Sequence, residues 1–100
     1  MAAVLSPRAR RDLLEAANWI AKDNPTAATG LRVAVVDAAR RIGDHPQIGK
    51  LQPDLADGPI YFLPLTAFPY VLVYRLDHDP PLILRVLHGA RNLPEVLRDI

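Results

Sequence analysis

Two segments in the first half of the chain carry hydrophobic residues at helical spacing, mostly three and four positions apart. The first set is Ala9, Leu13, Ala16, Ala17 and Ile20, and the second is Ala28, Leu31, Val35, Ala38 and Ile42. Ser6-Pro7 and Asn24-Pro25 precede the two sets, and a polar residue before proline is typical of a helix start. The pattern predicts one helix that ends near Ala21 and another that ends at Gly43, joined so closely that they form a hairpin.

Residues that favour strands dominate the second half of the chain. Tyr70 to Leu76 and Leu82 to His88 flank a five-residue break with two prolines, which predicts a β-hairpin. If the residues next to the break face each other, one face of the hairpin is almost wholly apolar. The other face then carries Arg75 and Arg85, whereas a shift of one residue in register would place these arginines on opposite faces.

The remaining segments complete an α+β fold in the order β-α-α-β-β-β. Ala2 to Leu5 is a possible short strand, residues 44–58 form a loop, and two prolines in Pro59 to Leu65 allow an edge strand at most. Leu93 to Ile100 has the amphipathic pattern of a short helical tail. We expect the helical hairpin to cover one face of a small antiparallel sheet and to leave the second face, with its two arginines, open.

Composition narrows the class of protein. A chain of 100 residues with 50% hydrophobic and 23% charged residues is long enough for one folded domain, which we assign to residues 1–100. The absence of cysteine and of a long apolar segment predicts a cytoplasmic protein without disulfides or a membrane span. A net charge of +1 is too small for binding through a broad basic surface, so we expect no direct sequence-specific binding of nucleic acid by this chain alone.

Few residue patterns suggest chemistry. The single serine is accounted for as a helix cap, and the three histidines lack the spacing of metal ligands, so we expect no serine triad, no metal and no cofactor. Arg75, Arg85, Arg91 and His88 remain as candidates for binding a target or partner. The arginines could neutralise a phosphate with His88 as an acid or base, as in a ribonuclease, or they could be solvated or paired with carboxylates. For His88 the register favours a structural place near Tyr70.

Five motifs in order resemble the ParE branch of the RelE/ParE toxins of bacterial type II toxin–antitoxin systems. They are L-S-P-x-A-x-x-D-L (Leu5 to Leu13), N-P-x-x-A (Asn24 to Ala28), H-P-x-I-G (His45 to Gly49), F-P-Y-V-L-V-Y-R (Phe68 to Arg75) and I-L-R-V-L-H-G-A-R-N (Ile83 to Asn92). The resemblance covers nearly the whole chain. It implies a small toxin that is neutralised by a ParD-like antitoxin encoded beside it.

The resemblance also implies a choice of targets. ParE-like members are associated with inhibition of DNA gyrase, whereas RelE-like members cut mRNA on the ribosome. RelE-like nucleases generally use basic residues across the sheet and a tyrosine or histidine near the C-terminus, which Leu93 to Ile100 lacks. Many relatives have arginines where this chain has Tyr61 and Phe62. We therefore expect a non-enzymatic gyrase inhibitor, with a ribosome-dependent endoribonuclease and a weakened toxin that serves mainly its antitoxin complex as alternatives.

Three aromatic residues are candidates for antitoxin contact. Tyr61 and Phe62 lie in the predicted edge strand, and Trp19 lies at the edge of the apolar stripe of the first helix. Trp19 either closes the core or anchors a partner. We expect an antitoxin segment to lie along the helical hairpin and the sheet, and to become ordered on contact.

Overall fold

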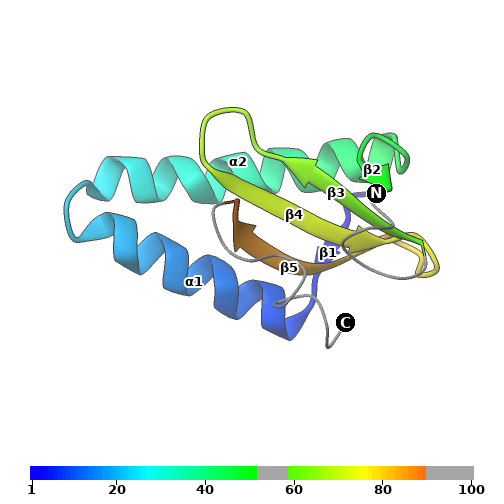
Figure 1. Ribbon diagram of the computed structural model, residues 1–100, viewed down its shortest axis with the longest axis horizontal. Helices are drawn as coiled ribbons and strands as arrows, with labels where there is room; N and C mark the ends of the chain where they lie inside the picture. Colours follow the sequence, from blue (N-terminus) through cyan, green and yellow to red (C-terminus); the bar gives the residue numbers. More distant parts are fainter. Residues whose placement is uncertain (52–58, 90–100) are drawn as a thin grey trace.

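Two helices pack against one five-stranded sheet in the computed structural model, which describes residues 1–51 and 59–89 (Figure 1). The helices are α1 (Pro7–Ala21) and α2 (Pro25–Asp44), and the strands are β1 (Val4–Leu5), β2 (Lys50–Leu51), β3 (Ile60–Pro64), β4 (Tyr70–Arg75) and β5 (Leu82–His88). The α+β class and the helical hairpin are therefore confirmed. The expected tail from Leu93 to Ile100 lies outside the described residues.

Both helices begin at the predicted caps. The Ser6 hydroxyl accepts a hydrogen bond from the backbone N–H of Ala9 at 3.0 Å, and the Asn24 side chain accepts one from Ala27 at 3.0 Å. A cap of this kind stabilises a helix by about 1 kcal/mol. The Ser6 hydroxyl also donates to the carbonyl of Leu84 at 3.0 Å, so the start of α1 is fixed to β5.

The sheet has the order β1-β5-β4-β3-β2 and is mixed. The first strand pairs parallel to β5, and the other pairs are antiparallel, so the expectation of a wholly antiparallel sheet is wrong for β1. The segment expected to be a loop contains β2, a two-residue strand that pairs with Tyr61 and Phe62 of β3. Consequently β3 is not the edge strand that its prolines suggested.

The β4–β5 hairpin follows the predicted register for four pairs and then departs from it. Tyr70 faces His88 and Leu72 faces Val86, as predicted, but Tyr74 faces Ile83 and leaves Leu84 as an extra residue. Because of this β-bulge, Ile83 and Leu84 lie on the opposite faces of the sheet from those that we expected. Ile83 packs in the core under the helices, whereas Leu84 packs on the opposite face.

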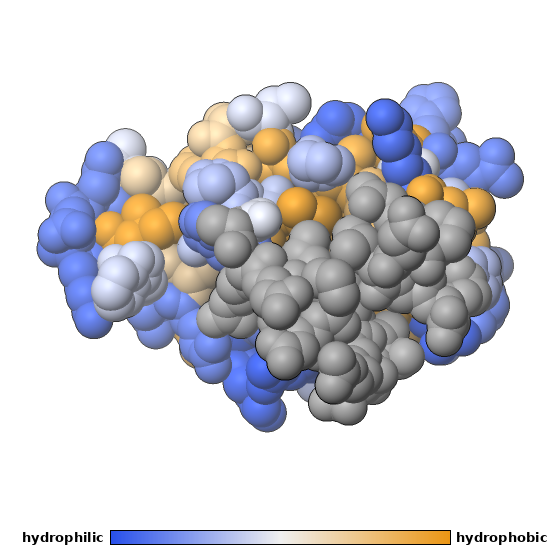
Figure 2. All heavy atoms as spheres, in the orientation of Figure 1, coloured by the Kyte–Doolittle hydropathy of each residue, from blue (hydrophilic) through white to orange (hydrophobic). Residues whose placement is uncertain are grey.

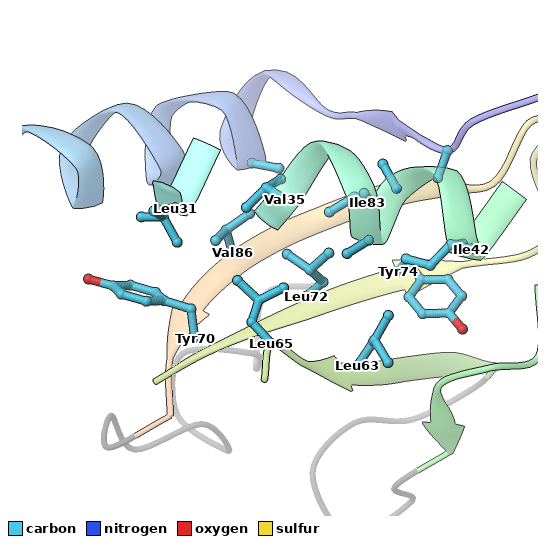
Figure 3. Close-up of a cluster of buried hydrophobic side chains, with 14 of the residues drawn as sticks. Leu31, Val35, Ile42, Leu63, Leu65, Tyr70, Leu72, Tyr74, Ile83 and Val86 are labelled. Carbon is cyan, nitrogen blue, oxygen red and sulfur yellow. The ribbon is translucent and has the colours of Figure 1, made fainter. Parts of the chain in front are cut away.

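The main core lies between the sheet and the helical hairpin (Figure 3). Leu31, Val35 and Ile42 of α2 are fully buried against strand residues such as Leu72. Tyr74 is buried among them, and its hydroxyl donates to the carbonyl of Pro46 and accepts from the N–H of Gly49, both at 2.8 Å. Burial raises the pKa of Tyr74 above its ordinary value of 10.0. A tyrosine at this position thus fixes the segment after α2 to the middle of the sheet.

The face of the sheet away from the helices is also apolar and buried. Its cluster consists of Ile60, Phe62, Val73 and Leu87, none more than 5% exposed. The expectation of an open face that displays two arginines is therefore wrong. A sheet face made of these side chains has the character of a second core rather than of a charged binding surface.

Gly43 lies inside the last turn of α2, one residue before the helix ends. A Cβ atom at this position would lie 1.9 Å from the carbonyl oxygen of Met1. Ala3 donates from its backbone N–H to the carbonyl of Ala39 at 2.9 Å, so the start of the chain runs against this part of the helix. Glycine is needed here because the two backbones touch, and not because it stops the helix as predicted.

Candidate functional site

A buried ion pair joins α1 to β5. Arg85 donates from Nε and Nη2 to the two carboxylate oxygens of Asp12, at 2.7 and 3.1 Å, and the backbone N–H of Val86 donates to Oδ2 of the same carboxylate at 3.1 Å. The Arg85 side chain is 11% exposed and that of Asp12 is 6% exposed. Arg85 therefore does not lie on an open face as expected, since the bulge beside it lets the guanidinium reach the helix.

Asp12 lies four residues after Arg8, a spacing typical of an exposed ion pair on a helix. The Arg8 Nε and Asp12 Oδ1 atoms are 3.7 Å apart, but Asp12 is buried. The signal for burial is present in the sequence, because Asp12 lies three residues after Ala9 and four before Ala16, on the apolar stripe of the helix. A carboxylate on such a stripe requires a buried partner.

A recess of about 330 Å³ opens between α1 and the ends of β4 and β5. Successive turns of α1 supply one wall and the strand ends supply the other. Of the residues that the structure describes, those that line the recess are Asp12, Glu15, Ala16, Trp19, Tyr70, Val86 and His88. They include three aromatic rings and two carboxylates, and two of them, Trp19 and His88, were expected to contact a partner.

Trp19 does not close the core. It is 69% exposed, and Nζ of Lys22 lies 4.9 Å from the centre of its ring. This distance is that of a cation–π contact. Hydrophobic side chains also reach the surface near the tip of the helical hairpin, at the left of Figure 2. Because Trp19 is exposed, the structure rules out that it closes the core, and the ring is available for contact with a partner.

His88 lies on the helix-covered side of the sheet, as the register predicted. Its ring meets that of Tyr70 edge to face, with 5.2 Å between centroids and 77° between planes. Tyr70 itself is buried, and Figure 3 shows it at one end of the cluster of buried side chains. The histidine is therefore oriented by an aromatic neighbour at one end of the recess.

Arg75 has different surroundings from Arg85. It pairs in register with Ile60, so it leaves the sheet on the face away from the helices, and its guanidinium binds the carboxylate of Asp77 through Nε at 2.9 Å and through Nη2. The hydrogen bond from Arg75 holds the pKa of Asp77 below its ordinary value of 3.8. The structure thus separates the two arginines that were expected to act together. Arg91 lies outside the described residues.

The two aromatic residues of β3 point to opposite faces. Tyr61 is half-buried and stacks on Tyr74 with 5.4 Å between centroids. Phe62 is 1% exposed and belongs to the apolar cluster on the other face. Tyr61 is thus accessible in part to an antitoxin, whereas Phe62 contacts its own chain.

Two further features concern residues 1–51 and 59–89. No three side chains of His, Cys, Asp or Glu gather there in a group that could hold a metal ion. Neither of the two helices in these ranges is long and apolar enough to cross a membrane.

Comparisons with known proteins place this geometry among toxins. The family model of the ParE toxin of the type II toxin–antitoxin system parDE matches residues 3–93. Toxin RelE3 of Caulobacter vibrioides (strain ATCC 19089 / CIP 103742 / CB 15) is 30% identical over 88 residues, which are 88% of this chain and 94% of the relative. Putative toxin Y4kP of Sinorhizobium fredii (strain NBRC 101917 / NGR234) is 32% identical over 93 residues, with 90% of each chain covered. A solved structure of the chromosomal ParDE system from P. aeruginosa has the same fold, with a TM-score of 0.74 and 18% identity over 88% of this chain and 95% of the other.

Proposed function

Because the chain belongs to the ParE toxin family of type II toxin–antitoxin systems, we propose that it inhibits DNA gyrase by binding it and that a ParD-like antitoxin neutralises it. Under this proposal the chain acts by binding another protein, and it catalyses no reaction itself. The proposal extends the family assignment to a specific target and a specific class of partner, and cytoplasmic action follows from both.

The ion pairs of the two arginines on the sheet are the main support for this proposal. Arg85 is buried against Asp12, and Arg75 is paired with Asp77. A guanidinium that stabilises a cleavage transition state must face the scissile phosphate, but each of these groups already faces a carboxylate. This arrangement supports binding over phosphodiester cleavage.

The helical hairpin supports the existence of a protein partner. Leu14, Trp19, Val33 and Val36 of the two helices are 47% to 69% exposed. Scattered apolar residues are normal on a surface, but four large ones on a two-helix unit are suited to a partner that covers the hairpin. We propose the antitoxin as that partner, in contact with Trp19 and with the accessible part of Tyr61.

Induction of the chain without its antitoxin tests the target. Under the proposal, cells become filamentous and mount an SOS response, and the purified protein inhibits supercoiling by gyrase. Simultaneous expression of the antitoxin should restore growth, which controls for effects of overproduction. An unchanged supercoiling reaction, together with normal growth, would point instead to a weakened toxin that serves mainly its antitoxin complex.

A ribosome-dependent endoribonuclease is the second candidate, because the relative from Caulobacter vibrioides is named Toxin RelE3. Under this alternative, induction stops translation rapidly and leaves cleaved mRNA. Primer extension on an abundant transcript after induction distinguishes it from gyrase inhibition. Cleavage that disappears when Arg75 and Arg85 are intact but His88 is replaced would assign the histidine as an acid or base.

A further inference from the structure

We propose that the recess between α1 and β5 binds the cationic side chain of a lysine or arginine from the antitoxin. The inference rests on the proposed antitoxin partner and adds the chemistry by which one of its residues is recognised. The recess is lined by the stripe from Asp12 to Trp19 on α1 and by the strand ends at Tyr70 and His88.

Ala16 creates the hollow. It lies four residues after Asp12 and three before Trp19, so the three side chains follow one stripe of the helix. Ala16 is 8% exposed and its methyl group forms part of the floor. A larger residue between the carboxylate and the indole would fill the space. The volume of about 330 Å³ is at the small end of ligand pockets, which span roughly 300–1,000 Å³, and so fits one side chain better than a nucleotide.

The aromatic walls favour a cation. The faces of tryptophan and tyrosine rings carry partial negative charge and attract ammonium and guanidinium groups. Trp19 already holds one such group, since Nζ of Lys22 lies 4.9 Å from its ring centre. Lys22 is not among the described residues that line the recess, so its ammonium group does not occupy the hollow. The Trp19 ring therefore borders the recess and also contacts a cation of its own chain.

The two carboxylates have different roles. Asp12 accepts three hydrogen bonds, from Arg85 and from the N–H of Val86, and its charge is balanced by the buried guanidinium. Glu15 lies one turn further along the same stripe and is exposed. We therefore assign to Glu15 the charge that meets the incoming cation, and to Asp12, which Arg85 and Val86 hold in place, the role of a rigid part of the wall.

The single tryptophan provides a direct test. Because Trp19 is the only tryptophan in the chain, the tryptophan fluorescence comes from a residue that lines the recess. Titration with N-acetyl-arginine methylamide should change the emission, whereas the uncharged N-acetyl-norleucine methylamide should change it much less. Glu15→Gln should weaken binding of the arginine probe roughly two- to fivefold, as for an exposed ion pair. The matched control Asp23→Asn removes an exposed carboxylate beyond the end of α1 and should leave binding unchanged.

The antitoxin complex provides the second test. Trp19→Ala should raise the dissociation constant for the antitoxin by roughly tenfold or more, as for an aromatic hot spot, and Glu15→Lys should raise it further than Glu15→Gln. The control Val36→Ala shortens an exposed side chain on α2 and should have a smaller effect. Replacement of each lysine and arginine of the antitoxin by methionine should identify one position whose loss is not additive with Glu15→Gln.

Two results would overturn the inference: equal binding of the arginine and norleucine probes, or an antitoxin affinity that Glu15→Lys leaves unchanged. None of these measurements involves gyrase. They therefore test the recess independently of the proposed target.

Discussion

Asp12 and Arg85 lie 73 residues apart in the sequence and form a buried, two-pronged ion pair that closes α1 onto β5. The aspartate also accepts a hydrogen bond from the backbone of Val86, beyond the two residues of β5 that pair with β1. One carboxylate thus neutralises a buried charge and accepts a hydrogen bond from a backbone N–H that lies outside the β1–β5 pairing. Asp12 therefore has two roles, because it forms this buried ion pair and also lines the recess.

Replacement of Asp12 by alanine should destabilise the protein by about 3–5 kcal/mol, because it leaves a buried guanidinium without its carboxylate. Asp12→Asn should cost less, since its amide oxygen can still accept from Val86. Urea unfolding followed by circular dichroism measures both. Asp37→Asn removes an exposed carboxylate 3.9 Å from Arg40 and should cost about 0–1 kcal/mol. A loss for Asp12→Ala no larger than for this control would contradict burial of the pair.

The two glycines of α2, Gly30 and Gly43, should differ in how much their replacement by alanine changes stability. Replacement of an exposed glycine inside a helix by alanine usually raises the free energy of unfolding by about 1 kcal/mol. Gly43→Ala should instead lower the melting temperature, because the new methyl group would meet the backbone of Met1 at 1.9 Å. Gly30→Ala meets the end of the Phe68 side chain at 3.2 Å, which can move, so its effect should be small. Thermal unfolding of the two variants compares them directly.

Tyr74→Phe should cost about 1–3 kcal/mol, because the N–H of Gly49 and the carbonyl of Pro46 lose their shared partner. The same residue predicts a pH dependence. Its pKa is raised in the folded state, so the folded protein holds its proton more tightly than the unfolded chain. The stabilisation is present below the ordinary pKa of 10.0 and is lost as the pH rises through the folded pKa. In Tyr74→Phe this alkaline loss of stability should shrink, as measured by urea unfolding at pH 8 to 11.

Arg75→Gln should return the pKa of Asp77 towards 3.8, because it removes the hydrogen bond that favours the carboxylate. Titration of the side-chain carboxyl carbon by NMR measures this shift. Arg75→Lys should retain part of the effect through its charge. The fold should tolerate both changes, in contrast to Arg85→Lys, which loses the planar contact with Asp12 in a buried site. An unfolded Arg75→Gln protein would show that this exposed pair has a structural role.

The parts of the fold that sequence could predict are those determined locally. Ser6 and Asn24 identified the starts of both helices, because a cap and the proline after it act within one turn. The alternation of Tyr70 and Leu72 gave the correct face of β4, since both belong to the core under the helices. These features depend on neighbours a few residues away.

The parts that could not be predicted depend on distant contacts. The extra residue at Leu84 appears only in the pairing of β5 with β4, and no local pattern in the sequence marks it. Lys50–Leu51 becomes a strand because β3 pairs with it, although its own sequence has no strand pattern. Trp19 lies at the border of the apolar stripe, where a rotation of the helix by a few tens of degrees decides between core and surface. The recess was missed for the same reason, because its walls come from opposite ends of the chain.

The parallel pairing of β1 with β5 also determines when the toxin can become complete during synthesis. The first strand leaves the ribosome early, yet Val4 and Leu5 must wait for Leu82 and Ile83 before their pairing exists. The cap at Ser6 likewise gains its second hydrogen bond from Leu84, 78 residues later. Contacts of such sequence separation form late and slow folding. A nascent chain that ends before β5 therefore lacks the Asp12–Arg85 ion pair, the recess and the finished sheet, so an incompletely synthesised chain cannot present the surface that α1 and β5 form together.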